Sequence, residues 1–314
     1  MRNWWMATVL LAGLTWSIHA QSQALPAPDR EAVGHESAQP RRDDGYPTHA
    51  WTLAPIEVKG QNRTQLREED HVGDYEQPRW TAYRRFPSTR TYVVPSGTLT
   101  LEYWNQYNQP LASHKDRRVR AYYEAEIGLG HRLQLDLYLI TEQHGYAQPS
   151  EIKKESIEVR YALADWGRLW GNPTLYVEWV RENGGPDALE GKLLLAGEVA
   201  SGYHAGINLA VERALGADFG HEYQISAGLS RTLSDQALSL GLEGRFEFHD
   251  AAGKRLMNLF DQAALVGPSL SWSPVPPMHL LWSVLAGPVK GELNPSESGW
   301  GGAVESWLVL GFTL

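Results

Sequence analysis

The stretch RVRAYYEAEIGLGHRLQLDLYLIT, residues 118–141, decides the fold. From Val119 to Leu129 every second residue is apolar or aromatic, and the positions between carry Arg, Tyr, Glu or Gly. After Gly130 and His131 the alternation resumes through Leu139. A period of two residues is strand geometry, so the stretch predicts an antiparallel hairpin with one apolar and one charged face. Each arm exceeds the usual five or six residues and matches the roughly 9–11 residues of a strand that crosses a bilayer.

A soluble sandwich or a membrane barrel could contain such a hairpin, and the rest of the chain distinguishes the two. The alternation returns from residue 97 to the end and predicts an all-β fold, a transmembrane antiparallel up-and-down β-barrel of about twelve strands. An irregular N-terminal periplasmic extension is expected to precede it. The strands are expected near residues 97–107, 117–129, 132–142, 154–164, 173–182, 190–200, 203–214, 221–231, 237–249, 263–273, 278–288 and 303–314.

The lengths of the connections favour the membrane barrel. Those after the even-numbered strands are mostly short, as at residues 130–131 and 201–202, whereas those after the odd-numbered strands are mostly longer, as at 250–262 and 289–302. Short turns on one rim and long loops on the other are typical of outer-membrane barrels. A soluble sandwich gives no reason for this sorting.

Charged residues gather on one face of the predicted strands. Because a charge facing lipid near the midplane costs up to a few kcal/mol, we expect these side chains to line the lumen, where opposite charges can pair across strands. The lumen-lining candidates are Arg118, Arg120, Glu124, Glu126, Asp136, Glu158, Arg160, Glu178, Glu243, Arg245 and Glu247.

The N-terminal third differs from the barrel. Residues 1–20 have the basic start, short apolar run and small residue before Gln21 that indicate a signal peptide, removed on export to the outer membrane. Residues 21–96 read as a largely irregular periplasmic leader or a possible plug of the barrel 97–314. Within this leader Arg84, Arg85 and Arg90 are a possible gate. Residues 53–60 resemble the peptide by which TonB-dependent receptors bind their periplasmic energiser, and a docked linker is the alternative.

Cysteine is absent, so neither disulfides nor an acylated N-terminal cysteine is available. The chain has 13 tryptophans and 14 tyrosines. Several lie near predicted strand ends, where aromatic girdles meet lipid headgroups, and ordinary core packing is the alternative for each. These are Tyr107, Trp166, Trp170, Trp272, Trp282 and Trp300.

The signal, the two-residue repeats and the C-terminal strand WLVLGFTL, residues 307–314, resemble bacterial outer-membrane β-barrels as a class. That resemblance implies outer-membrane lipid around the barrel and recognition of the C-terminal strand by the barrel-assembly machinery, although the last residue is Leu314 and the aromatic residue, Phe312, is displaced. More narrowly, PSTR at 87–90, VPSGTLTLE at 94–102 and VGPSLSW at 266–272 resemble a family of outer-membrane transporters loosely grouped with phenol-degradation-pathway proteins.

Catalytic and cofactor signatures are not evident. The outer-membrane phospholipases and lipid A deacylases use Ser and His, but the only His-x-Ser sequence, His35 to Ser37, falls in the polar leader. The 11 histidines show no paired spacing that would predict a metal site, and no cofactor is expected. The net charge of −9 argues against nucleic acid as a partner.

These observations predict a non-enzymatic channel or transporter for a small solute. Nearly all of the excess negative charge falls in residues 97–314, which gives a weak preference for cations, opposed by the lumen arginines. The alternative is a non-transporting barrel that acts as a structural or interaction protein through its leader and outer loops.

Overall fold

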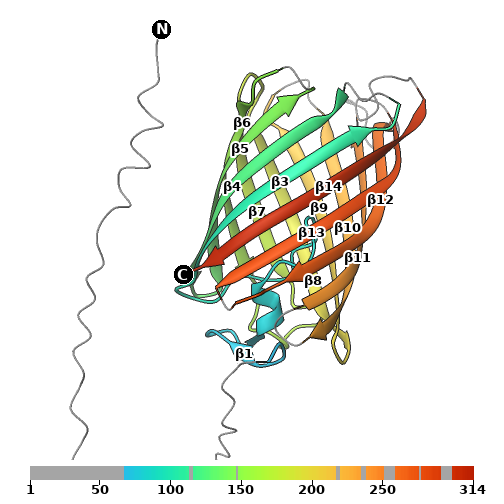
Figure 1. Ribbon diagram of the computed structural model, residues 1–314. Coiled ribbons are helices and arrows are strands. Elements are labelled where there is room, and N and C mark those ends of the chain that lie inside the picture. The colour runs from blue at the N-terminus through green and yellow to red at the C-terminus, as the bar shows by residue number, and fades with distance from the viewer. Residues whose placement is uncertain are drawn as a thin grey trace, which may run out of the picture. The chain divides into compact units, whose positions relative to one another are not determined.

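The computed structural model describes residues 67–112, 116–145, 148–216, 220–234, 238–250, 259–275, 277–290 and 299–314. The described residues all belong to one compact unit. The predicted signal peptide and residues 53–60 lie outside the described residues. Twelve strands form a closed barrel (Figure 1). They are β3 (Leu99–Pro110), β4 (Arg118–Gly130), β5 (Leu133–His144), β6 (Glu151–Ala162), β7 (Thr174–Glu182), β8 (Ala188–Ala200), β9 (Tyr203–Ala214), β10 (His221–Ser234), β11 (Leu238–Asp250), β12 (Leu259–Trp272), β13 (Met278–Lys290) and β14 (Trp300–Thr313).

Every barrel strand pairs antiparallel with its neighbours in sequence, and β14 closes the barrel on β3. The amide of Leu314 donates to the carbonyl of Leu99 at 2.8 Å, so the barrel begins and ends at one rim. The predicted all-β barrel and each of its twelve strands are therefore confirmed. The boundary differs most at β12, which begins at Leu259 rather than near residue 263, and β3 runs on past the predicted end to Pro110.

The apolar residues of the alternating pattern point outward. Large side chains such as Tyr123, Leu137 and Leu242 are exposed on the barrel surface, whereas their charged neighbours in sequence are buried inside. Because strand side chains alternate, this orientation follows directly from the two-residue period of the sequence.

Replacing outward-facing Leu242 with arginine should destabilise the barrel in lipid by about 2–4 kcal/mol, because the charge would face hydrocarbon in the middle of β11. Urea unfolding in lipid vesicles would measure this loss, and Leu242→Met should unfold like the wild type. An unchanged unfolding free energy for Leu242→Arg would show that this face does not contact lipid.

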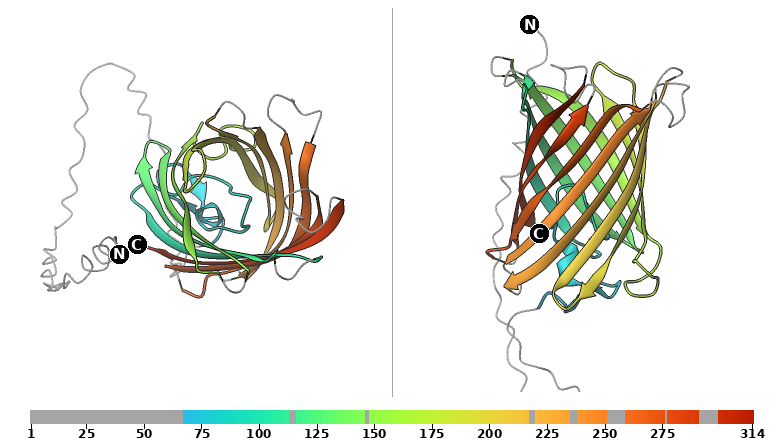
Figure 2. Two further views of the ribbon diagram at one scale, coloured as in Figure 1. Left: turned by 90° about the horizontal axis from the view of Figure 1, so that it is seen from above. Right: turned by 90° about the vertical axis from the view of Figure 1, so that its right-hand side faces the viewer.

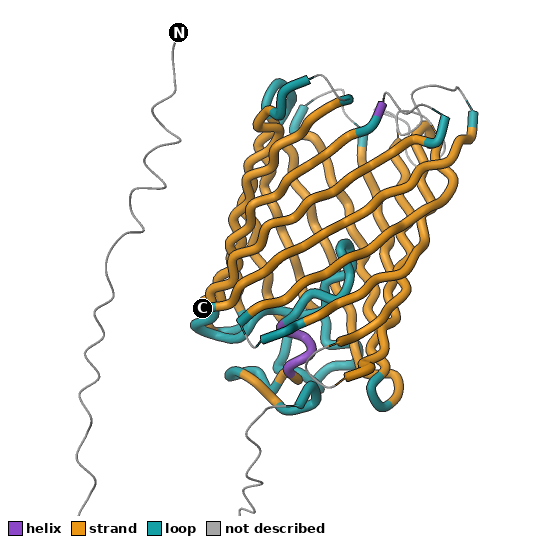
Figure 3. The backbone as a smooth tube through the Cα atoms, viewed as in Figure 1, coloured by secondary structure: helices purple, strands orange, loops and turns teal. Residues whose placement is uncertain are grey.

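Residues 67–98, called the plug from here on, fold into the barrel ahead of β3. They contain the two-stranded pair β1 (His71–Val72) and β2 (Gln77–Pro78) and the 3-10 helix η1 (Arg79–Ala82). Seen from above, this segment lies inside the ring of strands, and η1 lies at the rim where β3 begins and β14 ends (Figures 2 and 3). Among the described residues, no helix is long and apolar enough to cross a membrane.

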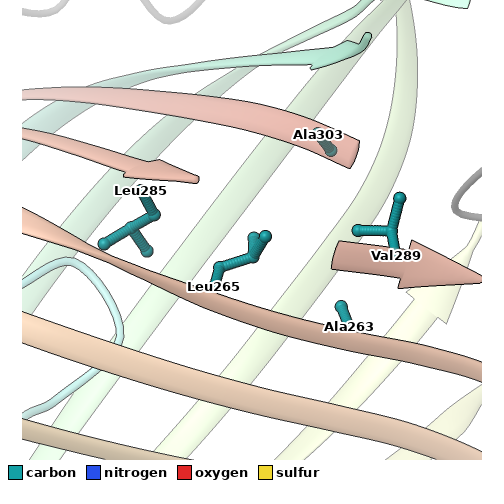
Figure 4. Packing of buried hydrophobic residues seen from close by; sticks show 5 residues of the cluster. All are labelled: Ala263, Leu265, Leu285, Val289 and Ala303. Carbon is teal, nitrogen blue, oxygen red and sulfur yellow. The ribbon is translucent and has the colours of Figure 1, made fainter. Parts of the chain in front are cut away.

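One part of the inner wall is apolar. Ala263 and Leu265 of β12 pack with Leu285 and Val289 of β13 and with Ala303 of β14 (Figure 4). All five are buried. We call this cluster the apolar wall. The alternation in the sequence predicts a charged inner face and does not predict this apolar interruption.

The pairing of β12 with β13 is interrupted. Their register is continuous, but the pairs between Ala263 and Val266 and between Val266 and Ser269 are missing. Pro268 and Pro288 lie at two of these positions and have no N–H to donate. At Gly267 the backbones approach so closely that a Cβ would lie 1.8 Å from the carbonyl oxygen of Val284.

Candidate transport lumen and its plug

Arg84 joins the plug to the barrel wall. Its Nε donates to Glu102 at 3.2 Å, and its Nη2 donates to Glu126 at 3.2 Å and to Glu124 at 3.4 Å. The guanidinium also lies over the ring of Trp104, 4.0 Å from the centroid. Burial by itself would lower the pKa of Arg84, but the three carboxylates outweigh burial and raise it. Arg84 is therefore a fixed positive charge at the centre of three carboxylates on β3 and β4.

These three carboxylates also have the proximity of a metal site, since their oxygens lie within 4.8 Å of one another. The Arg84 guanidinium already supplies positive charge to all three. Glu102 is further bonded to His279 at 2.7 Å and to Trp104 Nε1 at 2.8 Å.

Arg85 and Arg90 make separate contacts. Arg90 donates to Glu126, on the same wall as Arg84. Arg85 turns the other way, pairing with Glu68 of the plug at 2.8 Å and donating to Thr232 of β10 at 3.3 Å. Burial lowers the pKa of Arg85, and Glu68 opposes that effect. The structure thus places all three predicted gate residues in the lumen and divides them between two walls.

The tip of the plug, Ser88 and Thr89, is held by Glu243 of β11. One oxygen of Glu243 accepts the backbone amides of Ser88 and Thr89 at 3.0 and 2.8 Å and the Thr89 hydroxyl at 2.8 Å. Asn208 of β9 donates to the Ser88 carbonyl at 3.0 Å. Because a loop has no ladder to satisfy its backbone groups, these wall residues do so.

Phe86 holds the plug in place by packing against the barrel wall. Its side chain is buried against Gly228 and Gly241, where an added Cβ would come within 2.5 and 2.6 Å of the ring. Two neighbouring strands therefore leave a gap in the inner wall that the phenyl ring fills. Lower in the plug, Trp80 stacks on His204 with ring centroids 4.2 Å apart.

Trp166 belongs to this packing. It lies edge-on to Trp80 and Tyr92 of the plug, with ring centroids 5.5 and 5.2 Å apart. The prediction that Trp166 forms part of a lipid-facing girdle is wrong, because the turn after β6 folds inward over the plug. Trp170, Trp272, Trp282 and Trp300 are exposed.

The predicted lumen residues fall into two groups. Glu124, Glu126, Asp136 and Glu243 are buried at the level of the plug. The others line a cavity of about 410 Å³, whose wall also includes Arg84, Ser88 and Arg90 of the plug. These others are Arg118, Arg120, Glu158, Arg160, Glu178, Arg245 and Glu247. The structure thus places the plug tip on one side of the cavity.

Other charged residues of the lumen were not among the predicted candidates. Glu305 of β14 binds Arg245 at 2.7 Å, and Glu102 binds Arg84. The other inward positions of β3 are polar or aromatic, and those of β14 include the apolar Ala303 and Val309. An inward parity count of β3 and β14 would have identified them.

No family model matches this sequence, and no curated protein matches it. Among solved structures, the NanC porin is 9% identical, with 66% of this chain and 98% of that chain covered and a TM-score of 0.46. An outer-membrane channel from Pseudomonas putida F1 is 8% identical, with 74% and 100% covered and a TM-score of 0.47. The translocator domain of the autotransporter NalP from Neisseria meningitidis is 11% identical, with 68% and 87% covered and a TM-score of 0.41. These similarities concern the fold alone.

A closed antiparallel barrel with an apolar exterior and a charged interior is the architecture of bacterial outer-membrane β-barrels, and this chain has that fold. The narrower resemblance to transporters grouped with phenol-degradation-pathway proteins stays a prediction.

Proposed function

We propose that this protein is an outer-membrane channel for a small solute and that the plug closes its lumen. The observation that carries the proposal is the position of the plug tip beside the 410 Å³ cavity, held to the wall by side chains from several strands. A barrel of twelve strands is wider than the eight-stranded barrels that side chains fill, and narrower than open porins. Without a folded segment inside it, a barrel of this width would leave an open channel, and the plug closes that channel.

Arg84, Arg85 and Arg90 are the gate in this proposal, because each forms an ion pair or hydrogen bond that ties the plug to a charged or polar group. The excess of barrel carboxylates favours cations in the open lumen, and the arginines beside the cavity oppose that preference, so the proposed selectivity for cations is weak. The proposal contains no catalytic step. Outer-membrane lipid around the barrel and assembly through the C-terminal strand belong to the same proposal.

The test separates the hydrogen bonds of the plug tip from its packing. Glu243→Ala removes the acceptor of three hydrogen bonds, whereas Glu243→Gln keeps an acceptor oxygen of nearly the same size. At roughly 1 kcal/mol for each of the three bonds, the open population of Glu243→Ala should rise about a hundredfold. Ion conductance in planar bilayers measures this, and Glu243→Gln should conduct like the wild type.

Protein shown to be folded by heat-modifiable gel mobility is required for each measurement. Absence of conductance from the wild type and from Glu243→Ala, in folded protein, would contradict the channel. That result would favour the non-transporting interaction protein.

A further inference from the structure

A continuous row of carboxylates crosses the inner face of seven neighbouring strands. Each member lies directly opposite the next in the strand register, from β4 through β10. The row consists of Glu126, Asp136, Glu158, Glu178, Glu190, Glu212 and Glu222. The last five of these line the cavity. Like charges directly opposite one another destabilise a sheet, so each needs a compensating cation.

Compensation is incomplete at the centre of the row. Arg84 and Arg90 neutralise Glu126, Arg160 neutralises Asp136 and Glu158, and Lys192 lies 2.7 Å from Glu190. Within the described ranges, Glu178 and Glu212 form no ion pair with a lysine or arginine. Glu178 accepts a hydrogen bond from the Tyr176 hydroxyl. Lys192 acts electrostatically on Glu178, and Lys154 acts on Glu212, without an ion-pair contact. These two carboxylates flank Glu190 in the row.

A second row, with two cations and a tyrosine between them, runs beside it. Arg160, Tyr176 and Lys192 lie opposite one another on β6, β7 and β8, each two residues from a row carboxylate of its own strand. Arg160 is almost wholly buried and lines the cavity, yet its Nη1 has no hydrogen-bond partner among the described residues. Because a buried guanidinium N–H is costly to leave unpaired, this atom indicates a missing acceptor.

The cavity is bounded elsewhere by the apolar wall. Ala263, Leu265, Val289 and Ala303 line it from β12, β13 and β14, across the barrel from β6 to β8. Arg245 and Glu247 of β11 lie opposite Leu265 and Ala263 in the strand register and pair with each other, whereas Arg160 and Glu178 lie on the far side of the barrel. A solute that satisfies the whole cavity must be amphipathic.

We propose that the cavity is a binding site for a zwitterion with an apolar side chain, that is, an apolar α-amino acid or a short peptide. The ammonium group binds at Glu178 and Glu212, the carboxylate accepts from Arg160, and the apolar side chain faces the apolar wall. The volume of about 410 Å³ falls in the range of roughly 300–1,000 Å³ of small-molecule sites. This assignment rests on the proposed function, because it names the solute class of the channel.

Calorimetric titration of the refolded full chain in detergent micelles tests the assignment. The probes are L-phenylalanine, 2-phenylethylamine, which lacks the carboxylate, 3-phenylpropanoate, which lacks the ammonium, and glycine, which lacks the apolar group. L-phenylalanine should bind about tenfold more tightly than each of the other three, since each omits one charge-assisted or apolar contact. Equal affinity for L-phenylalanine and either single-charge analogue would overturn the zwitterion.

Two variants locate the ammonium subsite. Glu178→Gln and Glu212→Gln should each weaken L-phenylalanine about tenfold and leave 3-phenylpropanoate unchanged. The matched control is Glu155→Gln, because Glu155 is exposed on β6 and pairs with Arg181 at 3.3 Å on the outer face. Should one row variant fail to fold, the other decides.

Binding and conductance separate this inference from the channel itself. Conductance without binding of any probe would overturn the zwitterion site and leave the channel standing. Selective binding of L-phenylalanine without conductance in any variant would support the site and contradict the channel.

Discussion

Replacing Arg84 with methionine is expected to release the plug and to give the largest rise in conductance of any single substitution. Methionine fills a similar volume but leaves Glu102, Glu124 and Glu126 around a position without charge. Breaking a buried ion pair by removing one partner costs about 3–5 kcal/mol, and here three carboxylates lose the same partner. The plug-in state should therefore lose most of its population.

Planar-bilayer conductance and trypsin cleavage after Arg79, Arg85 or Arg90 would follow the release, because these bonds become accessible only when the plug leaves the lumen. Arg231→Met is the matched control, since Arg231 is exposed and lies over the ring of Tyr203, 5.2 Å from its centroid. A closed, protease-resistant Arg84→Met protein would contradict the role of this residue.

A double variant gives an independent check on the cause. Glu102 also binds His279, and Glu126 also binds Arg90, but among the described residues Glu124 forms an ion pair with Arg84 alone. Adding Glu124→Gln to Arg84→Met should therefore restore part of the closure. Strict additivity of the two substitutions would show that they do not act through one network.

Replacing Phe86 with alanine should have the second largest effect. The ring fills the gap that Gly228 and Gly241 leave in the wall, and truncating a buried phenylalanine costs about 3–5 kcal/mol in lost contacts and cavity. All charges stay in place in this variant. A rise in conductance would then report packing rather than electrostatics.

The absence of native cysteine makes a second measurement of this variant simple. A cysteine at buried Thr91 should react slowly with a maleimide in the wild-type background and quickly with Phe86→Ala. Phe246→Ala is the control, because Phe246 is exposed on the outer face of β11. Equal labelling rates in all three proteins would show that Phe86 does not hold the plug.

The sequence was sufficient to predict the barrel because each strand repeats the same two-residue alternation. The alternation from Leu238 to Phe248, for example, predicts both the strand and its two faces. The strand ends were less predictable. β3 continues past Tyr107 to Pro110, because a proline, which has no N–H, is tolerated at the end of a strand.

The plug contacts and the carboxylate row could not be predicted in the same way. Arg84 and Arg85 are adjacent, yet one meets β3 and β4 and the other meets β10, and nothing local separates them. Glu158, Glu178 and Glu190 are unevenly spaced along the chain and become neighbours only through strand register. Register depends on the pairing of whole strands, so alternation within one strand does not reveal it.

The interrupted pairing of β12 and β13 has a mechanical meaning. A closed barrel resists opening, because every strand is hydrogen-bonded on both sides and no edge is free. Between Ala263 and Ser269, β12 and β13 are joined by few backbone hydrogen bonds, and Pro268 and Pro288 have no N–H with which to form the missing ones. When this barrel unfolds, β12 and β13 should separate first. The barrel then opens into a twelve-stranded sheet with β12 at one edge and β13 at the other.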